Sequence, residues 1–219
     1  MPAVVTGANR GIGAAIFKEL QTRGIDTIGT SRTPTNGFIT ADVTKKHSVD
    51  LLAKHLDGQP VPLLVCNAGV LLDRNEKLAD GYAPEIWSAC FEVNVTGVFL
   101  TVQALLPQLQ QAAVDQGSAK IAIVSSVMGS SARPSGGTYI YRASKAAATN
   151  LGRNLATDLH DLGIAVGIYH PGWVRTDMGG PSADISESES AAGLVERFEA
   201  LSLGTTGCFL NWDGAEIDF

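Results

Sequence analysis

The sequence is poor in the residues that mark several common classes of protein. Only three cysteines occur among 219 residues, at widely separated positions, so no disulfide framework is expected and a reducing compartment is favoured. The four histidines have no ligand-like spacing with cysteine or acidic residues, so no metal site is expected. Basic residues number 16 against 22 acidic ones, and this net charge of −6 offers no basic stripe to nucleic acid.

Long apolar runs are missing as well. No segment approaches about eighteen uninterrupted apolar residues, so no membrane span is predicted. The first strand-like run begins at Ala3, which leaves no room for a signal peptide, and we expect a cytoplasmic protein. With 219 residues, of which 45% are hydrophobic and 17% charged, the chain has the size and composition of a single globular domain, residues 1–219.

Strand-like and helix-like segments alternate along the chain. Apolar runs predict strands at Ala3–Thr6, Thr27–Ser31, Gly37–Thr40, Pro62–Cys66, Lys120–Ser125, Ala165–Tyr169 and Gly207–Leu210. Helical periodicity predicts helices at Gly13–Arg23, Lys46–Leu56, Glu85–Gln111, Tyr139–Leu162 and Ser188–Leu201. This alternation implies an α/β protein with a parallel seven-stranded sheet covered on both faces. Right-handed crossovers make it a doubly wound Rossmann fold, which binds ligands at the carboxyl ends of the strands.

The first strand leads into a glycine-rich turn, Thr6-Gly7-Ala8-Asn9-Arg10-Gly11-Ile12-Gly13. Ile12, Ile16 and Leu20 then repeat at helical spacing. Glycine permits a tight turn and close backbone approach, and a helix N-terminus attracts phosphate. A plain strand-to-helix turn could contain the same glycines, but the strand before and the helix after favour dinucleotide binding.

Tyr141 and Lys145 lie four residues apart in an alanine-rich segment that reads as a helix. Residues at this spacing share one helical face. A fixed cation beside a phenol favours the phenolate, so Lys145 is expected to lower the pKa of Tyr141 and to suit it for proton transfer. Such pairs also arise by chance on many helices, so this pair gains its weight from the rest of the chain.

Together with four further motifs, these two segments resemble the short-chain dehydrogenase/reductase family in its single-domain form. The further motifs are Asn67-Ala68-Gly69, Val93-Asn94-Val95-Thr96-Gly97, Ser125-Ser126 after a strand, and Pro171-Gly172-Trp173-Val174-Arg175-Thr176. All six occur in the family's order between Thr6 and about Gly214. The segment around Tyr141 and the short chain look most like the C-factor and sniffer-type carbonyl reductases of this family.

The resemblance implies a catalytic role for four residues. Tyr141 would donate a proton to a substrate carbonyl, Ser126 would polarise the carbonyl oxygen, and Lys145 would also hold the nicotinamide ribose. Asn94 would position a water that resupplies protons. From the residues alone, Asn94 could instead satisfy a bent helix and Ser126 could cap a helix. The implied activity is reduction of a ketone or aldehyde with NADP(H).

The end of the second strand bears on the choice of cofactor. Ser31-Arg32 lacks the carboxylate that bonds the ribose hydroxyls of NAD, and Arg32 with Arg10 could bind a 2′-phosphate. A merely solvated Arg32 is the alternative. Asp42-Val43 resembles the family's adenine-binding pair, although Asp42 could simply occupy a surface turn.

By resemblance, the residues expected to contact NADP(H) are Gly7, Asn9, Arg10, Gly11, Ile12, Gly13, Ser31, Arg32, Asp42, Val43, Asn67, Ala68, Gly69, Tyr141, Lys145, Pro171, Gly172, Val174 and Thr176. Thr176 is assigned to the carboxamide. The polar segment Asp177–Ser190 follows, and it reads either as a mobile lid or as a plain surface loop. Tyr141 lies fifteen positions after Ser126, and the insertion Ser130–Thr138 between them should reshape the rim of the pocket.

The two longest predicted helices carry more apolar residues than one buried stripe requires. Val98, Leu100, Val102, Leu105 and Leu106 are examples, and such a surplus predicts a homodimer unless the insertion covers it. An alternative function is a nucleotide-binding signalling protein of the same fold with little turnover. Retention of all four catalytic residues favours the enzyme.

Overall fold

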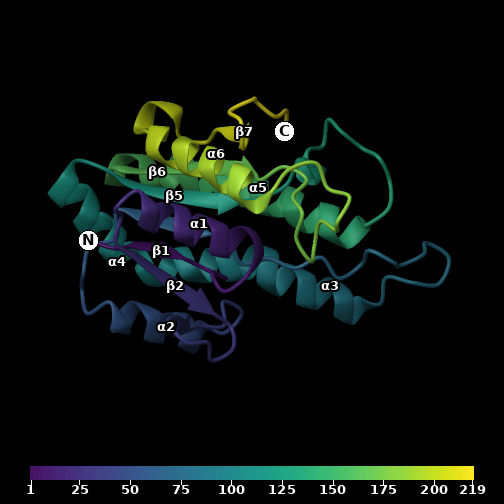
Figure 1. Cartoon of the computed structure of the whole chain (residues 1–219), viewed down its shortest axis with the longest axis horizontal. Coiled ribbons are helices and arrows are strands. Elements are labelled where there is room, and N and C mark those ends of the chain that lie inside the picture. The colour runs from purple at the N-terminus through teal and green to yellow at the C-terminus, as the bar shows by residue number, and fades with distance from the viewer.

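The structure is a computed structural model that describes all 219 residues, and its seven strands form one parallel sheet (Figure 1). The strands are β1 (Ala3–Val5), β2 (Thr27–Ser31), β3 (Ile39–Thr40), β4 (Leu63–Cys66), β5 (Ala119–Val124), β6 (Ile164–His170) and β7 (Phe209–Asn211). Their order is β3-β2-β1-β4-β5-β6-β7. The chain therefore reverses its direction of winding between β1 and β4, and this places a binding crevice at their carboxyl ends.

Helices cover both faces of the sheet, as the sequence predicts. They are α1 (Gly11–Thr22), α2 (Lys46–His55), α3 (Pro84–Phe91), α4 (Gly97–Gln116), α5 (Tyr139–Leu159) and α6 (Glu187–Ala200). Figure 1 shows α1 and α6 side by side in front of the strands, and the two helices pack together. Helices α2, α4 and α5 contribute to the larger core on the opposite face.

Successive residues of β5 serve the two cores in turn. Ile121 and Ile123 pack among residues of α4 and α5, whereas Ala122 and Val124 pack with residues of α1 and α6. A strand alternates its side chains between faces, so a strand buried on both faces must be apolar throughout. Burial of each isoleucine is worth roughly 1.5–3 kcal/mol, which fixes the register that carries Ser125 to the sheet edge.

Two predicted strands begin later in the structure because a glycine with positive φ stands at the predicted start of each. Gly37 has a φ of 82° and Gly207 also has a φ of 82°, and a strand cannot include that conformation. The predicted strand Gly37–Thr40 is therefore reduced to Ile39–Thr40, and Gly207–Leu210 is shifted to Phe209–Asn211. The last helix begins early, at Glu187, because Ser186 and Glu189 form a capping box.

The predicted helix Glu85–Gln111 is one continuous helical segment from Pro84 to Gln116, interrupted by a π-helical turn at Glu92–Thr96. Turns of this kind often mark functional sites. By length and hydropathy this segment could cross a membrane. Core helices of globular proteins pass the same test, and Val98 and Leu109 of α4 pack in the larger core.

The apolar surplus expected on α4 is only partly present. Val98, Val102 and Leu105 are buried within the chain's own core, and Leu100 and Leu106 are half-buried. The sequence argument therefore chose three residues that the sheet itself covers. The large apolar side chains that α4 does expose are Phe99, at 43%, and Val114, at 80%.

Candidate active site

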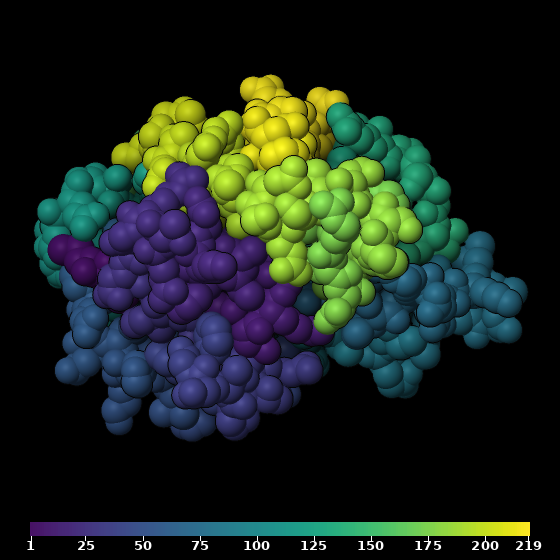
Figure 2. Space-filling view, viewed as in Figure 1, coloured from purple at the N-terminus to yellow at the C-terminus, as the bar shows by residue number.

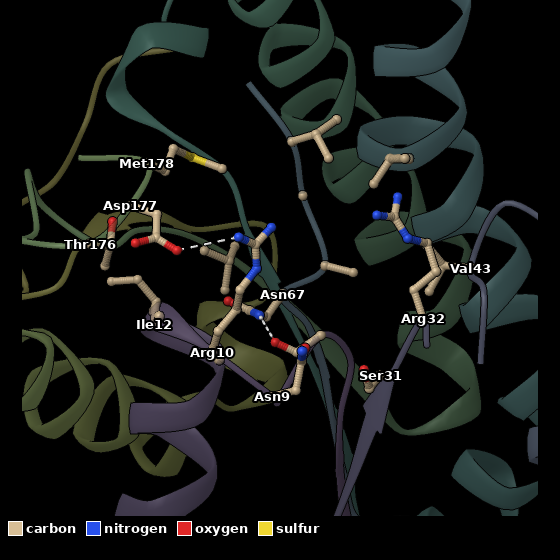
Figure 3. Close-up of a pocket in the computed structure, with 18 of the residues that line it drawn as sticks. Asn9, Arg10, Ile12, Ser31, Arg32, Val43, Asn67, Thr176, Asp177 and Met178 are labelled. Carbon is tan, nitrogen blue, oxygen red and sulfur yellow. Dashed lines mark hydrogen bonds and ion pairs between the residues drawn. The ribbon is translucent and has the colours of Figure 1, made fainter. Parts of the chain in front are cut away.

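A cleft of about 520 Å³ opens at the carboxyl ends of the central strands. Its walls come from the glycine turn after β1, the end of β2, the segment after β4 and the first turns of α5. Figure 3 draws most of its lining residues, and Figure 2 shows the segment after β6, in light green, overhanging the N-terminal part of the molecule. The volume lies within the range of pockets that hold small ligands.

The glycine turn is held in one shape by the motif after β4. The side-chain amide of Asn67 donates hydrogen bonds to the carbonyls of Thr6, at 2.9 Å, and Gly7, at 3.2 Å. A Cβ on Gly13 would lie 2.2 Å from the carbonyl oxygen of Gly7, so no larger residue fits there. Gly7 itself has a φ of 65°, which glycine adopts without strain.

The N-terminus of α1 faces the cleft without any cap of its own. Arg10 occupies the N-cap position in extended conformation and makes no side-chain hydrogen bond to the helix, and the first turn contains no acidic residue. The first N–H groups of α1 therefore lack a side-chain acceptor, and the positive end of the helix dipole adds to their attraction for an anion. This arrangement fits the phosphates of a dinucleotide.

The two arginines near the cleft have different surroundings. Arg32, after β2, is exposed and makes no ion pair. Arg10 is turned toward Asp177, whose carboxylate lies 3.4 Å from its guanidinium (Figure 3). Ser31 is buried beside Arg32, and its hydroxyl contacts that of Thr35 at 3.1 Å. In this structure Arg32 is thus the free cation at the end of β2.

Asp42 occupies a turn, as its structural interpretation expects, and its contact with adenine stays a prediction. The residue lines the cleft together with Val43. Its carboxylate also accepts hydrogen bonds from the amide of Thr44, at 3.0 Å, and from its hydroxyl, at 2.8 Å, which stabilise the turn before α2. Asp42 therefore shapes the wall of the cleft and supports the turn at the same time.

Tyr141 and Lys145 lie one turn apart on α5, and both are buried at the wall of the cleft. The ammonium of Lys145 is 5.7 Å from the centre of the Tyr141 ring and donates a hydrogen bond of 2.9 Å to the carbonyl of Val124. Burial raises the pKa of Tyr141 to about 12 and lowers that of Lys145 to about 8. The predicted lowering of the tyrosine pKa is therefore wrong, because desolvation of the phenol outweighs its neighbours.

Asn94 lies on the π-helical turn, and its side chain is fully engaged. Its carbonyl oxygen accepts from the amide of Val70 at 2.8 Å, and its NH₂ donates to the carbonyl of Val70 and to the hydroxyl of Ser144, both at 2.9 Å. Asn94 does not line the cleft. Its side chain therefore joins the bent helix to the loop after β4 and to α5, as the structural interpretation anticipated.

The serine pair after β5 divides its tasks. Ser125 lines the cleft, and its hydroxyl donates to the carbonyl of Lys145 at 3.1 Å. The same hydroxyl contacts the hydroxyl of Thr149 at 2.9 Å. Ser126 caps the short helix Val127–Gly129 by accepting from the amide of Met128 at 3.1 Å. Its hydroxyl also partly offsets the raised pKa of Tyr141. Ser126 thus lies next to the phenol, although it does not line the cleft.

The family profile described as short chain dehydrogenase matches residues 2–186. The chain belongs to this family. Among its relatives, the C-signal protein of Myxococcus xanthus is 34% identical over 170 residues, which cover 72% of this chain and 92% of the relative. The 1-hydroxy-2-glutathionyl-2-methyl-3-butene dehydrogenase of Rhodococcus sp. strain AD45 is 34% identical over an alignment of 232 positions. The alignment covers 99% of this chain and 98% of the relative.

Solved structures similar to this short chain dehydrogenase include carbonyl reductases. The NADPH-bound carbonyl reductase from chicken fatty liver is 29% identical, with a TM-score of 0.90 and coverage of 100% of this chain and 98% of that one. The carbonyl reductase Sniffer of Drosophila melanogaster is 26% identical, with a TM-score of 0.93 and coverage of 100% and 99%. The fold and the family predicted from the motifs are therefore confirmed.

The late motif of this short chain dehydrogenase contributes Pro171 and Thr176 to the cleft, but Gly172 and Val174 lie behind it. Val174 is buried and pairs with Ile185. Gly172 has a φ of 85°, and a Cβ there would meet Trp212 and Ile185. These two residues shape the turn that presents Thr176, whose hydroxyl accepts from the amide of Gly179 at 2.9 Å.

Hydrogen bonds connect part of the segment Asp177–Ser190 to its neighbours. The guanidinium of Arg175 donates to the carbonyls of Ala183, at 3.0 Å, and Asp184, at 2.9 Å, and Ser186 already begins the cap of α6. Only the first part, at Asp177 and Met178, lines the cleft. This first part is therefore the part of the segment that a ligand in the cleft would contact, and the mobile lid stays a prediction.

The structure also brings residues to the cleft that the list of expected cofactor contacts omits. They are Thr33, Ala41, Val70, Val93, Val124, Ser125, Asp177 and Met178. Several directly follow or end a strand, so counting outward from each strand end would have found Ala41 and Val124. Val93 has no such signal, because the π-helical turn that presents it is not visible in the sequence.

Proposed function

We propose that the chain is an NADPH-dependent reductase of ketones or aldehydes. The observation that carries the proposal is the buried pair of Tyr141 and Lys145, one helical turn apart at the wall of the cleft, with Ser126 beside the phenol. A purely structural helix would gain nothing from burying an ammonium without an ionic partner. The carbonyl reductases among the structural neighbours support the same reaction class.

Tyr141 is in its protonated form at neutral pH, which a general acid requires. With a pKa near 12 the phenol keeps its proton at neutral pH and can donate it to the oxygen of a substrate carbonyl. Bound NADPH supplies the hydride in such a reaction. The hydroxyl of Ser126 would hydrogen-bond the same oxygen as charge develops on it. Lys145, with a pKa near 8, can return a proton to the phenol because both of its protonation states exist near neutral pH.

The preference for NADPH rests on the end of β2. No carboxylate stands at this strand end to repel a 2′-phosphate, and Arg32 is exposed without an ion pair. A guanidinium binds a phosphate through two parallel hydrogen bonds. The chicken carbonyl reductase is described as NADPH-bound, and a similar short-chain dehydrogenase/reductase of Burkholderia multivorans as NADP-bound. The uncapped N-terminus of α1 would hold the pyrophosphate.

A homodimer through α4 and α5 is part of this proposal. Phe99 and Val114 of α4 are exposed apolar side chains of the kind that a partner covers. Sedimentation at micromolar concentration should give about twice the 22.9 kDa mass of the chain. A single species at the chain mass would contradict the dimer without affecting the proposed reaction.

A second candidate is a nucleotide-binding signalling protein with little turnover, and the C-signal relative is the observation that favours it. The two candidates differ in what Tyr141 must do. Oxidation of NADPH should be followed with a panel of ketones, aldehydes and diketones for the parent and for Tyr141→Phe. The reductase is supported if a carbonyl accelerates oxidation in the parent alone. NADPH binding without turnover of any carbonyl would favour the signalling protein.

A further inference from the structure

Helix α5, which carries Tyr141, begins without a cap from its own segment. Thr138 precedes the helix in left-handed conformation, with a φ of 42°, and makes no side-chain hydrogen bond to it. Gly136 and Gly137 before it also have positive φ, so the chain enters the helix from an irregular loop. The first N–H groups of a helix have no partner within the helix and need an acceptor from elsewhere when they are buried.

That acceptor is Asp73, in the loop after β4. Its carboxylate oxygen Oδ2 accepts from the amide of Ile140 at 2.8 Å and from the amide of Tyr141 at 3.4 Å. The cap therefore comes from a residue 67 positions earlier in the chain. Asp73 is 0% exposed, and its other oxygen, Oδ1, is buried without a partner. A fully buried carboxylate is rare unless its charge is compensated, and here it faces the positive end of the α5 dipole.

The main chain of Tyr141 is held at both ends of its residue. Its N–H donates to Asp73, and its carbonyl accepts a hydrogen bond of 2.8 Å from the hydroxyl of Ser144. Ser144 in turn accepts from Asn94, which also binds both main-chain groups of Val70. The loop that carries Asp73 is thus tied to α5 directly and again through the π-helical turn.

We propose that Asp73 is a positioning residue that holds the phenol of Tyr141 in place for proton donation by capping the catalytic helix from the loop after β4. The inference rests on the proposed function for its effect on turnover. The cap itself does not depend on that function, because its two hydrogen bonds are features of the fold.

The charge of Asp73 also affects Tyr141, because it contributes to the raised pKa of the phenol. Burial is the main cause of the raised pKa of Tyr141, and Asp73 and Cys90 raise it further. Arg74 and Ser126 oppose them, and Lys145 lies 5.7 Å from the centre of the ring. Removal of the Asp73 charge should therefore lower the pKa of the phenol, so that a basic limb in the pH profile of turnover moves to lower pH.

Three variants test the proposal. Asp73→Asn keeps an oxygen that can accept from the helix and removes the charge, Asp73→Ala removes both, and Asp80→Ala changes an exposed acid of the same loop as a control. We expect Asp73→Ala to lower kcat by about tenfold or more, with KM for NADPH within about twofold. Asp73→Asn should recover most of kcat and shift the basic limb to lower pH. Asp80→Ala should match the parent.

Amide exchange gives a readout that needs no turnover. The amides of Ile140 and Tyr141 should be protected in the parent and in Asp73→Asn, and should lose protection at least tenfold in Asp73→Ala. Parent-like kcat and pH profile in both Asp73 variants would overturn the proposal, as would unchanged exchange of these two amides in Asp73→Ala. If the parent reduces no carbonyl while exchange responds as expected, the cap stands, and the proposed function is what fails. Should Asp73→Ala not fold, the pH profile of Asp73→Asn decides.

Discussion

Around Tyr141, the side chains that meet the cleft or support it are buried and joined by hydrogen bonds of 2.8–3.1 Å, among them Ser125, Lys145 and Asn94. Elsewhere in the cleft, Arg32 is exposed, and Arg10 and Asp177 are 70% and 88% exposed and lie 3.4 Å apart. We call these the reaction half and the phosphate half. A buried network is strong and holds one geometry, whereas an exposed ion pair contributes about 0–1 kcal/mol and is screened by salt.

The difference matches the two tasks that the proposed function gives to the two halves. Proton donation depends on positions that vary by less than about an ångström, so the reaction half fixes its side chains before any ligand arrives. Recognition of a phosphate depends mainly on charge, which acts over a longer range and tolerates mobile side chains. Substitutions should therefore have their largest effects on turnover in the reaction half, and smaller effects, confined to cofactor affinity, in the phosphate half.

Of these variants, Tyr141→Phe should reduce turnover the most. Phenylalanine keeps the ring and its packing but removes the proton, and loss of a general acid lowers turnover by about 10²–10⁴-fold. Affinity for NADPH should stay within about twofold of the parent. Steady-state rates and fluorescence titration measure the two quantities. Retention of most of the parent's turnover would reject Tyr141 as the proton donor.

Lys145→Met should remove a pH dependence of stability. Burial lowers the pKa of Lys145 from 10.5 to about 8, so between these values the unfolded chain binds the extra proton and the folded chain does not. The contribution of Lys145 to stability should therefore rise with pH through this window, by about 3 kcal/mol in total, and fall again as pH drops toward 8. It is measured as the difference between parent and variant, because buried cysteines with raised pKa values act in the opposite direction. Urea unfolding at pH 8, 9 and 10 measures the slope. A slope unchanged in the variant would mean that Lys145 is not the titrating group.

The same substitution also reports on function. Lys145 is assigned to the reaction and to the ribose together, so Lys145→Met should lower both turnover and affinity for NADPH. Loss of turnover alone would separate Lys145 from the cofactor.

Arg32→Ala, in the phosphate half, should weaken the binding of NADPH. It removes a charge-assisted contact to the 2′-phosphate that is worth roughly 1.5–3 kcal/mol, which weakens NADPH binding about 10- to 150-fold. Affinity for NADH should not change, and Arg32→Lys, as a matched control, should retain part of the preference. Calorimetric titration with both cofactors measures the difference. Equal affinity of the parent for NADPH and NADH would contradict the preference at its root.

Asp177→Asn should have the smallest effect. It releases Arg10 from an exposed ion pair, so the guanidinium becomes available to a bound phosphate. Affinity for NADPH should increase by no more than about fivefold, and the gain should shrink as salt screens the charges. Titration at low and high salt tests both points. A decrease in affinity would show that Asp177 supports the ligand instead of competing with it.

The fold could be predicted because its signals are local. Alternation of apolar runs with helical periods gives the parallel sheet, and the turn from Gly7 to Gly13 gives the crevice at β1. The sequence does not show which residues that are far apart in the chain lie close together in the fold. Nothing in the helix of Tyr141 shows that its cap is Asp73, 67 positions away, or that Val98 of α4 faces the sheet instead of a partner.

The chemistry of the candidate site shows the same limit. Spacing correctly places Tyr141 and Lys145 on one face of a helix, but the sign of the tyrosine pKa shift depends on burial, which spacing does not report. The motif around Asn94 is visible in the sequence, but the hydrogen bond that its side chain accepts from Val70 depends on the π-helical turn. Pairwise rules for neighbours in sequence therefore fail where desolvation and remote partners decide.

The uncapped start of α1 means that the protein gives up stability in order to bind. A serine or aspartate in place of Arg10 would satisfy the first turn and typically stabilise a fold by about 0.5–2 kcal/mol. The same side chain would then occupy the N–H groups that a phosphate needs, and aspartate would repel it. Efforts to make the protein more heat-resistant by repairing that helix end should therefore yield a more stable protein that binds the proposed cofactor less tightly.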